Sequence, residues 1–231
     1  NNGTAPSQLV FEMPNSLVDI QAATGTVGGS IRKFGANRQK IPAGRDAIYF
    51  QNRLIVLFGP DNLAVSDILD PLHYSPILSE FKLNASGTDK VQAVYPFNQT
   101  TLLVFKERSI LAIQNITGDL TAVALTEITR DFGCIAPLSI TSTGSDVIFL
   151  SQRGVISLKQ TEFGISQSIV LPLSESIQPI IDTIDKANVE KSVGVYFDNR
   201  YLLSFPVSGN TTATRGQNTR TIVFNFLVLT L

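Results

Sequence analysis

Three acidic residues, Asp46, Asp89 and Glu190, stand just in front of apolar segments, and their side chains could do chemistry. Pairs of carboxyl groups about 5 to 9 Å apart hydrolyse glycosidic bonds, one as the acid and the other as base or nucleophile. Each of the three, however, has a basic neighbour in the sequence, and the chain has no tryptophan on which a sugar ring could stack. We therefore expect no catalytic residues, and a glycoside hydrolase is the less favoured alternative.

The chain has one histidine, His73, and one cysteine, Cys134. This pair cannot build a cysteine-based zinc cluster, and a lone cysteine excludes an internal disulfide. We expect His73 to pack in a turn beside Tyr74, and Cys134 to be a buried thiol without reactivity. The sequence predicts no metal site and no cofactor.

Two further segments resemble ligand-binding loops but lack the necessary spacing. In FGPDNLAVSDILDP, Phe58 to Pro71, Asp61 and Asp67 are a strand's length apart, whereas calcium loops alternate their oxygens around a tight turn that contains glycine. The glycines of TGTVGGS, Thr24 to Ser30, lack the Lys-Ser/Thr of a phosphate loop, so we expect a turn or linker there. We interpret Asp61-Asn62 as a hairpin turn and LAVS as the strand that follows it.

The charge and the hydropathy of the chain exclude two classes of partner. Lys and Arg number 18 and Asp and Glu 19, so no whole-chain basic surface is available to hold nucleic acid. The longest strongly apolar stretch, TIVFNFLVLTL, has 11 residues, too few to cross a bilayer, and the first residues do not form a signal peptide. Five Asn-x-Ser/Thr triplets match the pattern of glycosylation sites in a secreted protein, but turns rich in Asn and Thr produce such triplets by chance, and we favour this second interpretation. We expect a soluble protein that contacts no membrane.

Four segments repeat one plan of an apolar strand, a polar turn and a second apolar strand. They are Ala47 to Phe58, Ala93 to Ile113, Ser139 to Leu158 and Val193 to Val207. Their first turns, at Asn52, Asn98, Ser145 and Asp198, are spaced by 46, 47 and 53 residues. Such spacings are typical of propeller blades of four antiparallel strands, and second turns are expected near Asp61, Arg108 and Arg153.

The longer third interval contains a helical pattern. In SESIQPIIDTIDKA four isoleucines recur at i, i+3, i+4 and i+7, namely Ile177, Ile180, Ile181 and Ile184. We predict a short helix whose start is capped by Ser174 or Ser176 and whose apolar stripe lies on the sheet edges.

The sequence thus predicts an all-β fold, a β-propeller with about four to five visible blade-like four-stranded antiparallel units and one short inserted helix. We expect residues 1–40 to be an N-terminal segment, a linker or the end of a preceding unit, and residues 41–231 to be blades, an incomplete part of a longer chain. The pairs Arg45-Asp46, Asp89-Lys90 and Glu190-Lys191 predict a mixed charged rim at one end. The predicted core comprises Val104, Phe105, Ile148, Phe149, Leu150, Tyr201, Leu202 and Leu203.

A series of motifs between about Asp46 and Phe226 resembles the propeller-forming tail proteins of bacteriophages, and it is most similar to the nozzle or tail-hub component of short-tailed phages. The series is IYFQNRLIVLFGPDNLAVSDILDPLHY, LLVFKERSILAIQN, ITRDFGCIAPLSI, DVIFLSQRGVISL, DNRYLLSFPV and TIVFNF. The order in which these motifs follow one another along the chain is more specific than any single motif. The resemblance implies a non-enzymatic structural protein of the virion, in the phage tail.

The resemblance also implies partners. The chain would assemble with copies of itself into a ring, a hexamer, around the channel through which DNA passes transiently and without specificity. Neighbouring tail, portal-adaptor and fibre proteins would contact this ring. We expect contacts through blade edges and through the polar loop Ala213 to Thr219, and a cover over the apolar segment Thr221 to Leu231.

One further alternative is a glycan- or receptor-binding propeller of a virion surface. Exposed aromatic side chains on one face would support it. The candidates are Tyr49, Tyr95, Tyr196 and Tyr201, but the apolar runs are too continuous to assign their faces.

Overall fold

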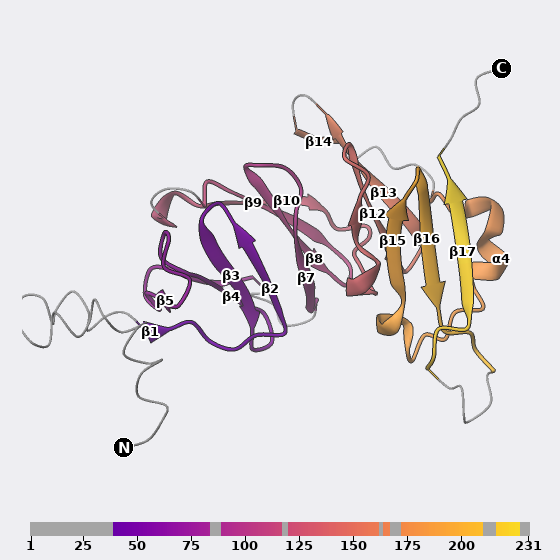
Figure 1. Cartoon of the computed structure of the whole chain (residues 1–231), viewed down its shortest axis with the longest axis horizontal. Helices are drawn as coiled ribbons and strands as arrows, with labels where there is room; N and C mark the ends of the chain where they lie inside the picture. The colour runs from indigo at the N-terminus through magenta and orange to yellow at the C-terminus, as the bar shows by residue number, and fades with distance from the viewer. Residues whose placement is uncertain are drawn as a thin grey trace, which may run out of the picture.

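The structure, a computed structural model, consists of antiparallel sheets that follow one another along the chain (Figure 1). It describes residues 39–83, 89–116, 120–161, 164–166, 172–209 and 216–226. The segment Thr24 to Ser30 and nearly all of the predicted N-terminal segment 1–40 lie outside the described residues.

Four sheets correspond to the four predicted repeats, and in each the strands pair antiparallel in a meander. The first contains β2 (Asp46–Phe50), β3 (Arg53–Phe58), β4 (Asn62–Val65) and β6 (Glu80–Lys82). The second contains β7 (Val91–Pro96), β8 (Thr101–Lys106), β9 (Ile110–Gln114) and β10 (Ala124–Thr129). The third contains β11 (Thr141–Ser142), β12 (Asp146–Ser151), β13 (Gly154–Thr161) and β14 (Gly164–Ser166). The fourth contains β15 (Val193–Phe197), β16 (Arg200–Phe205) and β17 (Arg220–Asn225).

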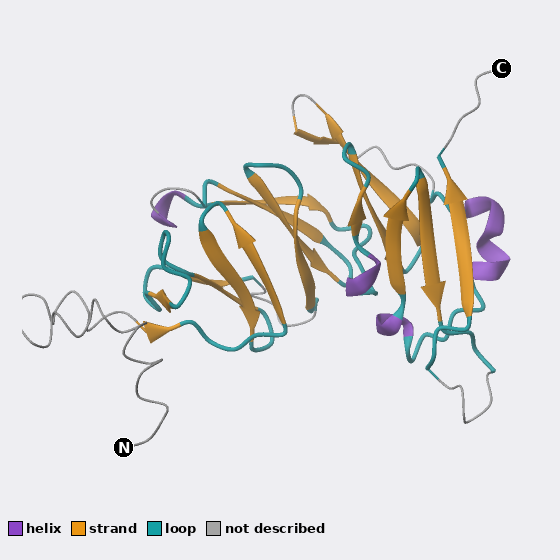
Figure 2. Cartoon of the chain, viewed as in Figure 1, coloured by secondary structure: helices purple, strands orange, loops and turns teal. Residues whose placement is uncertain are grey.

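The remaining elements are small and lie at the margins of these sheets (Figure 2). A two-stranded pair joins β1 (Gln39–Lys40) to β5 (His73–Tyr74). Helical turns are η1 (Leu120–Ala122), η2 (Pro137–Ser139), η3 (Glu175–Ile177), α4 (Gln178–Ile181) and η4 (Val189–Lys191). The prediction of an all-β fold with blade-like antiparallel units of a β-propeller and one short inserted helix is confirmed.

The turns follow the sequence because Asn and Asp tolerate left-handed backbone. The loop Gln51-Asn52 has φ of 51° and 62°, and Asp198-Asn199 has 51° and 54°. Two-residue hairpin loops with positive φ at both positions match the twist of the flanking strands. One turn is shifted from its expected place: Gly59 to Asp61 form it, and Asn62 already pairs with Phe58 as the first residue of β4.

The inserted helix is shorter than its apolar pattern suggests. Ile181 and Ile184 are buried against the fourth sheet, but Ile180 is exposed, so only half of the predicted stripe packs. Ser174 makes no side-chain cap. Its hydroxyl instead accepts a hydrogen bond from the backbone N–H of Val155, 3.0 Å away, because the serine lies beside the start of β13. The helix α4 itself has Ile177 at its N-cap position and no side-chain cap, so the predicted cap by Ser174 or Ser176 was wrong.

The core consists of three apolar clusters, one between each pair of consecutive sheets. Of the eight predicted core residues, Val104, Phe105, Ile148, Phe149, Leu150, Tyr201 and Leu203 are buried. Leu202 is only half-buried, which corrects the prediction. It lies on the face of the fourth sheet that points away from the third, opposite to the buried Tyr201 and Leu203.

Candidate functional site

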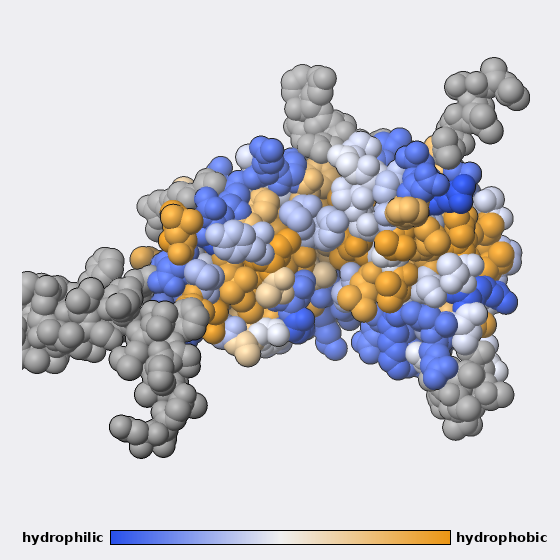
Figure 3. All heavy atoms as spheres, in the orientation of Figure 1, coloured by the Kyte–Doolittle hydropathy of each residue, from blue (hydrophilic) through white to orange (hydrophobic). Residues whose placement is uncertain are grey.

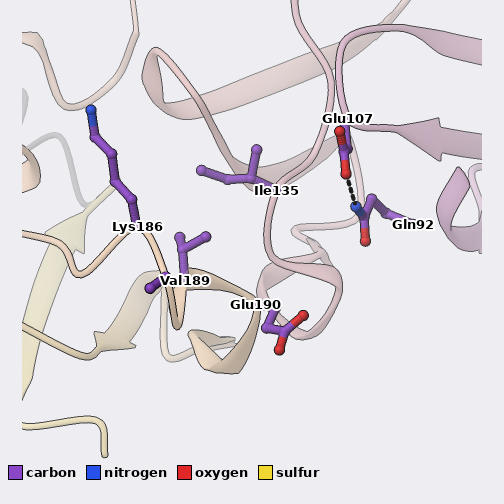
Figure 4. Close-up of a pocket in the computed structure, with 7 residues that line it drawn as sticks. Gln92, Glu107, Ile135, Lys186, Val189 and Glu190 are labelled. Atoms are coloured by element: carbon purple, nitrogen blue, oxygen red, sulfur yellow. Dashed lines mark hydrogen bonds between the residues drawn. The ribbon is translucent and has the colours of Figure 1, made fainter. Parts of the chain in front are cut away.

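One hollow among the described residues lies where the first strands of the first two sheets, β2 and β7, meet η2 and η4. This cavity has a volume of about 560 Å³ and is lined by Arg45, Asp46, Gln92, Ala93, Val94, Tyr95, Pro137, Leu138, Ile140 and Glu190. A second hollow of about 170 Å³ shares Gln92 and Glu190 and adds Glu107, Ile135, Lys186, Ala187 and Val189 (Figure 4). We call the two together the inner groove.

Asp46 lies in the inner groove, but its carboxylate joins two sheets. The backbone N–H of Val94 in β7 donates to Asp46 Oδ2 over 3.0 Å. The neighbouring Arg45 donates through Nη2 to the carbonyl of Pro60 at 2.8 Å and also to the carbonyl of Val91. Both side chains of the pair Arg45-Asp46 thus link the first sheet to β7 of the second sheet.

Glu190 lines the inner groove with Asp46, whereas Asp89 does not. The carboxylate of Asp89 accepts hydrogen bonds from the backbone N–H of Arg108 at 2.9 Å and from the hydroxyl of Ser109 at 2.5 Å. It therefore closes the β8–β9 turn of its own sheet. The predicted charged rim is therefore observed only in part. Arg45, Asp46 and Glu190 line the same groove, whereas Asp89 lies outside it.

Asp89 borders a lateral cavity of about 400 Å³ on the second sheet, with Lys106, Arg108, Ser109, Leu111, Glu127 and Arg130. Arg130 Nη2 donates to Glu127 Oε2 over 2.7 Å. This hydrogen bond lowers the pKa of Glu127 and raises that of Arg130. Glu127 and Arg130 thus form one ion pair at this cavity, as is common on a solvated surface.

Asp61 is buried and serves as a link between sheets. The backbone N–H of Val91, at the start of β7, donates to Asp61 Oδ1 over 2.9 Å, and Arg45 Nη2 lies 4.0 Å from the same oxygen. Asp67 forms a backbone bridge with Asp70, away from Asp61. Within the part of the chain that the structure describes, no group of three His, Cys, Asp or Glu side chains could hold a metal ion.

Asp61→Asn should lower the free energy of unfolding by about 0.5 to 1.5 kcal/mol, because the amide oxygen still accepts from Val91 but the charge near Arg45 is lost. Urea unfolding at neutral pH measures the change. Addition of calcium or of a chelator should leave both proteins unchanged, and a rise in stability with calcium in the parent alone would restore the metal-loop interpretation.

His73 lies in β5 beside Tyr74, and both are buried. Its Nδ1 lies 3.1 Å from Asp70 Oδ2 and 3.2 Å from Oδ1. Asp70 Oδ1 also accepts from the backbone N–H of Leu72 at 3.2 Å, so one carboxylate orders the whole turn. Burial, and then the charge of Glu80, raise the pKa of Tyr74. The expected packing beside Tyr74 is observed.

Cys134 is completely buried between the second and third sheets. Its Sγ lies 3.2 Å from the carbonyl of Ala136 and donates to it. Burial raises the pKa of the thiol to about 12. The thiolate is the reactive form of cysteine, and almost none of the native Cys134 is a thiolate at neutral pH.

We expect a thiol reagent such as iodoacetamide at pH 8 to leave native Cys134 unmodified over hours and to alkylate it completely in concentrated guanidinium chloride. The thiol stays protonated until the pH approaches its raised pKa, and the surrounding sheets exclude the reagent. Mass spectrometry of the intact protein counts the adducts. Rapid alkylation of the folded chain would contradict this burial.

The four candidate tyrosines are not gathered on one surface. Tyr49 is 57% exposed, whereas Tyr201 is fully buried and donates through its hydroxyl to the carbonyl of Ser139 over 2.9 Å. Tyr95 and Tyr196 are half-buried. Among the described residues the candidates thus form no aromatic platform for a sugar.

Sequence reasoning missed an apolar surface on the fourth sheet. Figure 3 shows apolar side chains gathered over this sheet. We call it the outer face, and its exposed or half-exposed apolar members are Val193, Val195, Phe197, Leu202 and Val223. Val193, Val195 and Phe197 alternate along β15 and could have indicated this face. Gly194 and Tyr196 between them are not polar enough to mark the solvent side, so the alternation could not assign the faces.

The two segments expected to make contacts are described only in part. Ala213 to Arg215 lie outside the described residues, and Gly216 to Thr219 follow as a loop in which Asn218 Nδ2 donates to the carbonyl of Lys191 at 2.8 Å. Of the segment Thr221 to Leu231, residues up to Phe226 are described, and the strand β17 ends at Asn225. The helices of the described residues are all too short or too polar to cross a membrane.

No protein-family model matches this chain, and no curated protein matches it. Among solved structures, the N-terminal domain of Nup159 is similar, with 12% sequence identity and a TM-score of 0.46 over 72% of this chain and 40% of that one. An S. cerevisiae complex of Dbp5 with Nup159, Gle1, IP6 and ADP contains a chain with 12% identity and a TM-score of 0.43, over 75% of this chain and 42% of that one. This chain thus spans about two fifths of the length of these neighbours.

Proposed function

We propose that this chain is a non-enzymatic structural module of a phage tail, part of the nozzle or hub ring around the channel through which DNA leaves the particle. The order of the sequence motifs between Asp46 and Phe226 supports the assignment to the tail. One structural observation supports the absence of catalysis: the carboxylates of Asp46 and Asp89 accept backbone N–H groups and thereby hold sheets and turns together.

The charge of the chain is compatible with a conduit. A net charge of −1 gives no field that would bind the phosphates of passing DNA. Partners would be further copies of the chain in a ring of six, together with portal-adaptor and fibre proteins, all in the virion. Closed rotational symmetry satisfies a head-to-tail interface without forming open filaments.

Quantitative mass spectrometry and electron microscopy of purified particles test this role. We expect the chain at a fixed copy number in the tail and no release of sugar from a panel of glycosides. A chain that is absent from particles, with hydrolysis that is lost in Asp46→Asn and kept in Asp89→Asn, would instead favour an enzyme that uses the inner groove.

A glycan- or receptor-binding propeller is the second candidate, favoured by one observation, the exposure of the Tyr49 ring. Aromatic rings with one exposed face bind the apolar faces of sugars. Binding to a glycan array that disappears in Tyr49→Ala, with no change in Leu125→Ala on the second sheet, would support this candidate. Equal binding by both variants would dismiss it.

A further inference from the structure

The lateral cavity of the second sheet carries more positive than negative charge. Three cations line it, Lys106, Arg108 and Arg130, against two acids, Asp89 and Glu127. Its volume of about 400 Å³ lies within the range of small-molecule pockets, about 300 to 1,000 Å³. An anion is therefore the class of ligand that the charge of this cavity favours.

Both acids of the lateral cavity already have partners. Glu127 forms an ion pair with Arg130, and Asp89 accepts a hydrogen bond from the backbone N–H of Arg108. The pKa of Glu127 is lowered most by the hydrogen bond from Arg130 and least by the charge of Lys106, so this lysine is not its close partner. The side chains of Lys106 and Arg108 thus remain, and the described part of the chain supplies neither with a hydrogen bond or an ion pair.

Lys106 is the more unusual of these two cations, because it is only 8% exposed. Leu102, Val104 and Lys106 alternate along β8, so their side chains share a face. The first two belong to the apolar cluster between the first and second sheets, and Lys106 stands where this face meets the lateral cavity. An ammonium group that is largely removed from water needs a counter-charge to offset its lost hydration. A dissolved anion can supply that charge through the cavity.

The fold itself does not require a lysine at this position. The second strands of the four sheets, β3, β8, β12 and β16, end at Phe58, Lys106, Ser151 and Phe205. Neutral side chains therefore end three of these strands, and only the strand beside the lateral cavity ends in a charge. The position of Lys106 is explained by the cavity rather than by the architecture of the blade.

We propose that the lateral cavity binds a phosphate monoester, with its phosphoryl group between the ammonium of Lys106 and the guanidinium of Arg108. The two negative charges of such an ester match the two cations, whereas a carboxylate would match only one. Lysine binds phosphate as a point charge, and arginine adds a planar pair of donors. Leu111 lines the same cavity and gives the organic part of the ester an apolar contact. This site goes beyond the structural role in a tail and does not depend on it.

Isothermal titration calorimetry with inorganic phosphate and with ribose 5-phosphate tests the site, at about pH 7.5, where both are mainly dianions. The ionic strength is held constant, so that general screening does not change between titrations. We expect one site per chain and a melting temperature that rises with either compound. Lys106→Met should weaken the binding of both compounds at least about tenfold, and Arg108→Gln about three- to tenfold.

Arg153→Gln is the matched control. Arg153 is the exposed arginine of the corresponding turn in the third sheet, between β12 and β13, and does not line the lateral cavity. This variant should bind both compounds like the parent. Lys106→Met keeps the length of the side chain, so we expect it to fold. Arg108 is exposed, and its variant decides the test if Lys106→Met does not fold.

Three results would overturn the proposal. They are the absence of both heat and a rise in melting temperature with either compound, an equal loss of affinity in Arg108→Gln and Arg153→Gln, and binding of acetate as tight as that of phosphate. A chain that binds neither compound but is found in particles keeps the tail role and loses this site. Binding that is lost in Lys106→Met, by a chain absent from particles, supports the site and dismisses the tail role.

Discussion

Replacing Phe149 by alanine should lower the free energy of unfolding by about 3 to 5 kcal/mol. The side chain is fully buried in β12 between the second and third sheets. Its ring meets that of Phe105 edge-on, with centroids 4.9 Å apart, and that of Phe132 at 6.4 Å. The truncation removes transfer free energy, leaves a cavity and loses both ring contacts, and the rigid sheets around it can collapse only in part.

Denaturant unfolding followed by circular dichroism measures this loss. Leu138→Ala, which removes an apolar side chain that is 62% exposed, is the control and should change stability by no more than about 0.5 kcal/mol. A Phe149→Ala variant that unfolds at the same denaturant concentration as the control would mean that the sheets do not pack on each other as described.

Gly133→Ala should lower the free energy of unfolding by about 1 to 3 kcal/mol. A Cβ atom on Gly133 would lie 2.1 Å from the carbonyl oxygen of Lys106 and 2.6 Å from the backbone nitrogen of Arg108. These are backbone atoms of the β8–β9 turn and cannot rotate away as a flexible side chain would. The next residue, Cys134, donates its N–H to the same Lys106 carbonyl over 2.8 Å, which fixes the approach.

The melting temperature of Gly133→Ala, compared with that of Ser145→Ala in an exposed turn, gives the readout. We expect a clear fall for the glycine variant and almost none for the serine variant. Equal melting temperatures would show that the segment before η2 can move away from the turn without cost.

The sheets and their turns could be predicted because local residues decide them. Asn52 and Asp198 tolerate positive φ, and runs such as Val104-Phe105 stand between such turns, so both the spacing of the repeats and most of the core follow from the sequence. The helix between the third and fourth sheets also follows from its apolar period, although its cap does not.

The roles of the acids could not be predicted, because each depends on a partner far along the chain. Asp61 accepts from Val91, 30 residues away, and Asp46 accepts from Val94, 48 residues away. The outer face of the fourth sheet stayed hidden for another reason. Phe197 on that face and Tyr201 on the opposite face are both apolar and aromatic, so alternation cannot tell which is covered.

The arrangement of sheets in a row makes the chain similar to a repeat array, in which each unit has contacts only with its nearest neighbours. An interior sheet can open only when two interfaces break, whereas an end sheet loses one. Local unfolding should therefore begin at the two ends, and amide hydrogens of β3 and β16 should exchange with solvent faster than those of β8 and β12.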